Sequence, residues 1–149
     1  MNRRHPILPW LCVALWLAFI WGHSLQTAAV SSQESGAALS ALSSLLAFFH
    51  LPPVFTEVIV RKLAHMTEYL ILAVLLAWGL EQPRRPLRVR LAALGGLCLT
   101  CAFLDETIQL FVPGRSGQIS DLWIDLGGSA MGALLWHLAQ ALRRCFKQK

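Results

Sequence analysis

Long apolar stretches separated by short polar segments run through the whole sequence. Four of these stretches, over residues 8–25, 56–80, 91–111 and 121–142, can each cross the roughly 30 Å of a membrane's hydrocarbon layer. Backbone polar groups inside a membrane must pair within their own segment, so we expect each stretch to form a helix. The pattern predicts an all-α membrane protein, a single domain over residues 1–149 with four transmembrane helices.

The polar segment between the first two stretches, residues 26–61, predicts a further helix. Ser31 and Glu34 have the S-x-x-E spacing of a capping box at a helix N-terminus. Apolar residues then recur at helical spacing, at Leu39, Leu42, Leu46 and Phe49. Pro52 and Pro53 end this pattern. We expect an amphipathic helix in this first outer loop that lies on the membrane interface or covers the bundle, either as a plain connection or as a substrate lid.

Composition favours a membrane protein over a soluble one. Hydrophobic residues make up 56% of the chain and charged residues only 14%, which is below the level of about a quarter that is usual in soluble domains. The net charge of +5 does not indicate nucleic-acid binding, because most of the basic residues stand in short runs beside the apolar stretches. We therefore expect membrane lipids as partners and no nucleic acid.

These basic runs also predict the orientation of the helices. Ten basic residues fall at the chain start, after the second stretch and at the chain end: Arg3, Arg4, Arg84, Arg85, Arg88, Arg90, Arg143, Arg144, Lys147 and Lys149. Only Arg61, Lys62 and Arg115 fall in the other loops. Because Lys and Arg accumulate on the cytoplasmic side, both termini are predicted to be cytoplasmic. The N-terminal segment also resembles a secretory signal peptide, but its apolar run is long for one and includes three tryptophans.

Two short motifs within the apolar stretches are interpreted as packing elements. Cys98 and Cys101 form a C-x-x-C pair, which in a soluble protein would indicate redox chemistry or zinc binding. The pair lies in a membrane stretch with no second pair and no histidine nearby, so we expect small core residues. Gly127, Gly128 and Gly132 contain a small-x-x-x-small motif that permits close approach of two helices.

Ionisable residues gather where the apolar stretches approach the predicted outer side. His65, Glu68 and Tyr69 are three and four residues apart and share one helix face, with Lys62 one turn earlier. Arg61 is expected to face solvent or lipid headgroups; alternatively, it joins Lys62 and Arg115 in holding a phosphate or carboxylate headgroup. The second stretch therefore opens with a polar face at its outer end.

The other two stretches and the loop between them add acids and an arginine. Three polar residues share a face near the outer end of the third stretch: Asp105, Glu106 and Gln109. Two acids one turn apart open the fourth: Asp121 and Asp125. Arg115, in a loop with glycines, is expected to pair with Asp105, Glu106 or Asp121. Such groups are costly in a membrane and mark either an extracytoplasmic pocket or polar pairing that fixes the bundle; their number favours a pocket.

Together these strings resemble the VanZ-like family. The residues that carry the resemblance are Arg61, Lys62, His65, Glu68, Tyr69, Asp105, Glu106, Gln109, Pro113, Gly114, Arg115, Asp121 and Gly128. The family is similar to an accessory protein of glycopeptide resistance. The resemblance therefore implies the bacterial cytoplasmic membrane, a role in the cell envelope and a link to teicoplanin resistance. Family members often have Asn where this chain has Asp125, which weakens a catalytic role for that residue.

Three functions are compatible with this pattern. The first is binding of, or action on, a lipid-linked or cell-wall ligand by a polar pocket on the extracytoplasmic side; its candidate residues are Lys62, His65, Glu68, Tyr69, Asp105, Glu106, Gln109, Arg115 and Asp121. The second is a membrane-embedded hydrolase or transferase on a lipid-linked substrate, with the catalytic candidates His65, Asp105, Glu106 and Asp121. A divalent cation such as magnesium or calcium suits these carboxylates. The third is a small transporter, against which the position of all the acids on one side argues.

Overall fold

The computed structural model describes residues 7–81, 85–115 and 117–147. It contains five helices over these residues: α1 (Ile7–Ser24), α2 (Ala28–Phe48), α3 (Glu57–Gly79), α4 (Leu87–Leu110) and α5 (Ile119–Lys147). No strand occurs in these three ranges, so the predicted all-α class is confirmed. Of the basic residues that predict the orientation, Arg3, Arg4, Arg84 and Lys149 lie outside the described residues.

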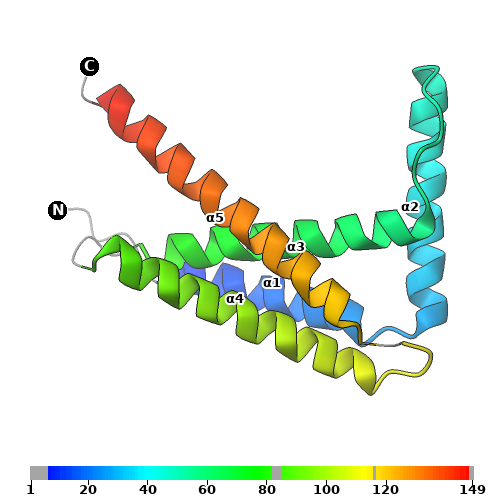
Figure 1. The fold of residues 1–149 in the computed structure, drawn as a ribbon, viewed down its shortest axis with the longest axis horizontal. Coiled ribbons are helices and arrows are strands. Elements are labelled where there is room, and N and C mark those ends of the chain that lie inside the picture. The colour runs from blue at the N-terminus through cyan, green and yellow to red at the C-terminus, as the bar shows by residue number, and fades with distance from the viewer. Residues whose placement is uncertain (1–6, 82–84, 116, 148–149) are drawn as a thin grey trace.

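Four of the helices run in alternating directions along the molecule, and α2 crosses one end of them (Figure 1). α1 runs toward α2, α3 runs back from it, α4 returns toward it and α5 leads away again. The first turn of α1 and the last turn of α5 consequently lie at the end opposite α2. We call the end where α1 and α4 finish and α3 and α5 begin the capped end, and the opposite end the distal end.

α1 and α4 are long and apolar enough to cross a membrane, judged by length and composition alone. Both also expose large apolar side chains, such as Leu15 of α1 and Phe103 of α4, which are 73% and 64% exposed. A helix in the core of a soluble protein would bury most such residues. α3 and α5 carry charged residues near the capped end, and membrane passage of these two helices stays a prediction.

α2 begins earlier than the capping-box motif predicts. Its N-cap is Thr27, in an extended conformation, and Ser31 already lies within the helix. The predicted capping box is therefore wrong, and Glu34 instead accepts a hydrogen bond from the Gln26 side chain at 3.0 Å. The first backbone amide of α2 reaches a carbonyl of the loop after α4, so a contact with a distant segment helps to set the start of this helix.

The predicted apolar face of α2 is partly covered by the bundle. Leu39, Leu42 and Leu46 are each partly buried, and α2 packs against α3. Phe49 differs from the prediction, because it follows the last helical residue and is exposed. Leu45 is exposed as well, so α2 has apolar groups both toward and away from the bundle. This distribution fits a helix that lies between the bundle and a membrane interface.

α3 and α5 approach closely because two glycines of α5 face α3. A Cβ atom on Gly128 would collide with the Met66 carbonyl oxygen, and one on Gly132 would collide with the Leu70 carbonyl oxygen. The interpretation of these two glycines as a packing motif is thus confirmed, whereas Gly127 has open space around it. The close approach also brings neighbouring residues of the two helices together.

Apolar packing continues from this contact toward the distal end. The buried apolar residues of α3 and α4 include Leu72, Ala73, Leu76, Ala77, Leu94 and Ala102. Cys98 and Cys101 lie in the same core, and both carry free thiols. Their interpretation as core residues is therefore confirmed.

Candidate functional site

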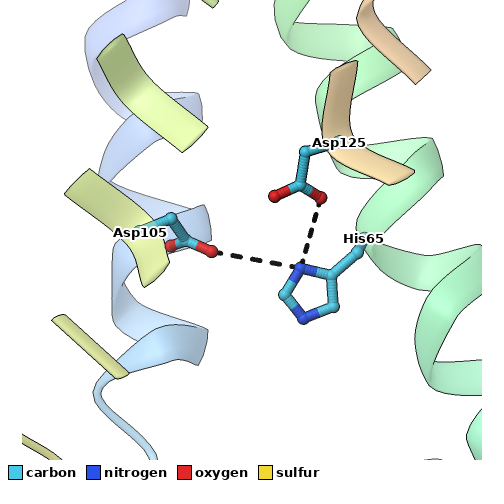
Figure 2. A group of neighbouring side chains, drawn as sticks. All are labelled: His65, Asp105 and Asp125. Carbon is cyan, nitrogen blue, oxygen red and sulfur yellow. Dashed lines mark ion pairs between the residues drawn. The ribbon is translucent and has the colours of Figure 1, made fainter. Parts of the chain in front are cut away.

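Three ionisable side chains from three helices meet near the capped end (Figure 2). His65 of α3 directs its Nδ1 atom toward Asp105 of α4 and Asp125 of α5. This atom lies 3.9 Å from an Asp105 carboxylate oxygen and 3.5 Å from an Asp125 oxygen. Both aspartates are 0% exposed, and the histidine side chain is 13% exposed. We call these three residues the His–Asp cluster.

Helix periodicity and the glycine contact together form this cluster. His65 directly precedes Met66, whose carbonyl faces Gly128, and Asp125 lies three residues before that glycine. Only a glycine at this position permits the approach, because a side chain there would strike the α3 backbone. Asp105 reaches the same point from α4, so the cluster depends on the packing of three helices.

Asp105 is oriented by two neutral donors. The Ser24 hydroxyl, at the end of α1, donates to one carboxylate oxygen, and the Gln109 side-chain amide donates to the other at 3.3 Å. Both donors are themselves buried. They fix the direction of the carboxylate without neutralising its charge.

Asp125 and Tyr69 lack such donors. Neither carboxylate oxygen of Asp125 has a hydrogen-bond partner among the described residues, and the same is true of the Tyr69 hydroxyl. Both residues are fully buried. A buried polar atom without a partner costs free energy, so this part of the site has unused capacity for a donor or a cation.

A cavity of about 180 Å³ opens beside the cluster. Its walls come from the end of α1, from α2, from the first turns of α3 and from the loop after α4; the polar residues are His23, Ser24, Gln26, Ser31, Glu34, Ser35, Arg61, His65, Glu68 and Arg115. Ser24 and His65 line the cavity and also lie against Asp105, so the cavity reaches the cluster. α2 provides one wall, which is the position expected of a helix that covers a pocket.

Several charged groups of the cavity have partners. Glu68 lies 3.1 Å from the Nδ1 atom of His23. Arg61 donates to Glu57 at 3.1 Å and to Ser32 at 3.2 Å. Arg61 lines the cavity, and its buried Nε atom has no hydrogen-bond partner among the described residues.

Arg115 brings a positive charge to the cavity without an acidic partner among the described residues. Its guanidinium donates to the backbone carbonyls of His23 and Gln26, each at 3.1 Å, and thereby ties the loop after α4 to the junction of α1 and α2. Burial, and then the positive charge of Arg61, lower the pKa of the Arg115 guanidinium. An arginine still stays protonated at neutral pH.

The ion pair predicted between Arg115 and Asp105, Glu106 or Asp121 is wrong. The guanidinium instead donates to the carbonyls of His23, near the C-terminal end of α1, and of Gln26, just beyond it, because the C-terminal end of a helix attracts a cation. The positive charge of Arg115 therefore remains available to an anion in the cavity.

Some of the predicted site residues lie outside the cavity lining. Lys62 and Asp121 form an ion pair at 3.7 Å between α3 and α5. Glu106 accepts a hydrogen bond from the Gln118 backbone amide at 2.7 Å. The structure thus brings His65, Glu68 and Arg115 to the cavity, and Asp105 beside it. A ligand-binding role of all these residues stays a prediction.

The predicted ligand-binding set omits several residues that the structure places in or beside this site, among them His23, Ser24, Arg61 and Asp125. For Asp125 a signal exists, because it lies one turn after Asp121 and three residues before Gly128. Arg61 is expected to face solvent, yet it lines the cavity. The two α1 residues have no sequence signal, because only the packing of α1 shows which of its faces meets α3 and α4.

Comparison with known families gives a match over most of the chain. A family model described as VanZ/LLP1 matches residues 9–140. No curated protein and no solved structure matches the chain. The matched range contains all the residues of the cavity and of the His–Asp cluster.

Proposed function

The chain belongs to the VanZ/LLP1 family, and we propose that it crosses the bacterial cytoplasmic membrane four times, with both termini in the cytoplasm. The alternating course of α1, α3, α4 and α5 supports four crossings (Figure 1). The excess of basic residues in the predicted cytoplasmic segments supports the orientation. In this orientation the capped end, with α2 across it, lies on the extracytoplasmic side.

Reporter fusions test this topology. A fusion within residues 26–55 or 113–119 is expected to report an extracytoplasmic position. A fusion within residues 85–90 or after residue 145 is expected to report the cytoplasm. An extracytoplasmic reporter after residue 145 would contradict the proposed orientation, whatever the ligand.

We infer that the cavity binds the anionic headgroup of a lipid-linked envelope ligand. The observation that carries this proposal is Arg115, a partly buried cation in the cavity wall with no acidic partner among the described residues. Arg61 adds a second guanidinium group to the lining of the cavity. Guanidinium groups bind phosphate and carboxylate oxygens with directed, charge-assisted hydrogen bonds. The hydrocarbon part of such a ligand would lie along the exposed apolar faces of the helices.

Native mass spectrometry of the detergent-purified protein tests this binding, with a polyisoprenyl phosphate as the probe. The parent is expected to bind it more tightly than the neutral polyisoprenol of the same length. Arg61→Gln should lower the affinity by about tenfold, the equivalent of one charge-assisted hydrogen bond. Arg88→Gln, an exposed arginine of α4 at the distal end, is the matched control and should bind like the parent. Equal binding of the phosphate and the alcohol would contradict the proposal.

Membership of the VanZ/LLP1 family supports a link to glycopeptide resistance. We propose that headgroup binding contributes to it in a bacterium that carries the gene. Deletion is then expected to lower the minimal inhibitory concentration of teicoplanin, and Arg61→Gln should restore it less well than the parent gene. Unchanged susceptibility after deletion would show that this protein does not contribute to resistance, and the binding proposal would still stand.

Catalysis on the same ligand is a second candidate function. The observation that favours it is His65, which lies between two buried carboxylates and also lines the cavity, as a general base of a hydrolase or transferase would. Mass spectrometry of the lipid after incubation with the protein distinguishes the two functions. A binding protein leaves the mass of the lipid unchanged, whereas an enzyme yields a product that His65→Gln fails to form.

A further inference from the structure

We propose that the His–Asp cluster binds a divalent transition-metal ion such as Mn²⁺ or Zn²⁺, with His65, Asp105 and Asp125 as its protein ligands. This site goes beyond headgroup binding, which rests on the arginines of the cavity wall and does not require a metal ion.

The spacing of the side-chain atoms fits such an ion after small inward movements. Donor atoms around a bound Zn²⁺ lie about 3–3.5 Å apart, because each metal–ligand bond is about 2.0–2.2 Å long. The His65 Nδ1 atom lies 3.5 Å and 3.9 Å from the two carboxylates, and one ligand atom from each residue lies within 4.8 Å of the others. These separations are too long for good direct hydrogen bonds but close to those of a shared ion.

Asp125 gives an independent reason to place a ligand here. It is 0% exposed, and both of its carboxylate oxygens lack a hydrogen-bond partner among the described residues. Figure 2 shows this carboxylate directed toward the same histidine atom that Asp105 approaches. A buried carboxylate without donors is costly, and coordination of a cation satisfies it.

A divalent ion balances the charge of the cluster when both aspartates are ionised. Two ionised aspartates carry two negative charges, of which a protonated His65 would cancel one. A divalent cation held by a neutral imidazole cancels both. Arg115 also acts on Asp105, but two backbone carbonyls hold its guanidinium.

Asp105 has the hydrogen-bonded surroundings of a metal ligand. Ser24 and Gln109 donate to its two oxygens and fix its direction, as outer donors do around bound metals. Access is provided by the cavity, because Ser24 and His65 line its wall. An ion can therefore enter from the capped end.

The donor set selects the class of ion. One imidazole nitrogen with two carboxylate oxygens suits Zn²⁺ and Mn²⁺. Calcium prefers about six to eight oxygen ligands, which the cluster does not supply. The proposal therefore narrows the divalent cation expected from the carboxylates alone to a transition metal.

The test uses the full-length, tag-free protein in detergent, stripped with a chelator and dialysed against Mn²⁺ without added lipid. The parent is expected to retain about one Mn²⁺ per chain, which Zn²⁺ displaces. Pulsed electron paramagnetic resonance should detect the nitrogen of a coordinated imidazole. Bound Mn²⁺ should also raise the melting temperature, because the ion binds the folded protein only.

Three variants assign the ion to the cluster. Asp125→Asn and His65→Gln each remove one ligand at nearly constant size and should lower Mn²⁺ affinity by at least about tenfold. His65→Gln should also abolish the nitrogen signal. Glu81→Gln is the matched control: it removes a carboxylate that contacts Gln140 at the distal end, and it should bind Mn²⁺ like the parent.

Two results would overturn the proposal. One is a parent protein that retains neither Mn²⁺ nor Zn²⁺ at millimolar free ion. The other is equal binding by the parent, Asp125→Asn and His65→Gln, because the ion would then lie elsewhere. If either variant fails to fold, the test rests on the parent protein alone. A parent with bound Mn²⁺ but no nitrogen signal from a coordinated imidazole would then also contradict the proposed site. This test contains no lipid, and the polyisoprenyl phosphate measurement can be repeated in the presence of a chelator, so each proposal can fail while the other holds.

Discussion

The two ends of α3 bury opposite kinds of side chain. Near the capped end its buried or partly buried face carries His65, Glu68 and Tyr69, whereas toward the distal end it buries Leu72 and Leu76. Apolar burial stabilises a fold, while buried charges cost stability unless they are paired. Apolar packing thus accounts for the residues that α3 buries at the distal end. The ionisable residues that it buries at the capped end cost stability, which indicates that they serve a function.

α1 and α4 repeat this contrast at their own capped ends. Ser24 and Asp105 bond to each other there, while farther along the same helices Val13 and Leu94 are buried in the apolar core. The change occurs within one helix in each case, so it follows from position in the bundle rather than from the type of element. Substitutions matched between the two ends can therefore test it.

The largest expected effect comes from the glycine contact on which both ends depend. Gly128→Ala should destabilise the protein by about 3 kcal/mol or more, because the new Cβ meets the Met66 carbonyl, which cannot move away as a side chain can. Gly127→Ala, the adjacent control, has open space and should stabilise α5 by about 0.5–1 kcal/mol. Melting in detergent measures both. Similar losses for the two variants would show that the α3–α5 approach is looser than described.

The next largest effect is a difference in stability between substitutions of the two buried aspartates, Asp105 and Asp125. Without metal, Asp105→Leu should cost about 2 kcal/mol or more, because Ser24 and Gln109 lose their acceptor. Asp125→Leu should cost less than Asp105→Leu, because Asp125 accepts no hydrogen bond and loses only its 3.5 Å contact with the His65 Nδ1 atom. Thermal unfolding in chelator compares them. An equal loss for both would mean that the contact between Asp125 and His65 stabilises the fold as much as the two hydrogen bonds of Asp105 do.

A smaller effect is expected at the loop that Arg115 holds. Arg115→Lys keeps the charge but cannot reproduce both bonds to the carbonyls of His23 and Gln26, and should cost about 1 kcal/mol. Arg88→Lys at the distal end is the control and should change stability by less than about 0.5 kcal/mol. Melting curves and limited proteolysis at the α1–α2 junction report the difference. An unchanged cleavage rate would show that the hydrogen bonds of Arg115 do not order the junction between α1 and α2.

The smallest effect should come from a carboxylate at the distal end. Glu81→Gln should change stability by less than about 0.5 kcal/mol, because the new side chain still has an oxygen to accept the hydrogen bond from Gln140. Detergent melting checks this. A large loss of stability in Glu81→Gln would contradict the contrast between the two ends, because the charge of a side chain would then affect stability at both ends.

Local pattern was enough to predict much of this fold. The apolar stretches predict α1, α3, α4 and α5 to within a few residues at nearly all ends, and the loop leucines predict α2. Gly128 and Gly132 are recognisable as a packing motif, and His65 and Asp105 as site candidates. These features depend on hydrophobic runs and on helical spacing, which are properties of neighbouring residues along the chain.

Only the tertiary structure determined which residues these side chains contact. Ser24 meets Asp105 from 81 positions away, and Arg115 binds carbonyls 89 and 92 positions away instead of an acid. Local pattern also could not predict where α2 starts or that Asp125 lies against His65. The reason is that spacing shows which residues share a helix face, but the rotation and approach of packed helices determine what that face meets.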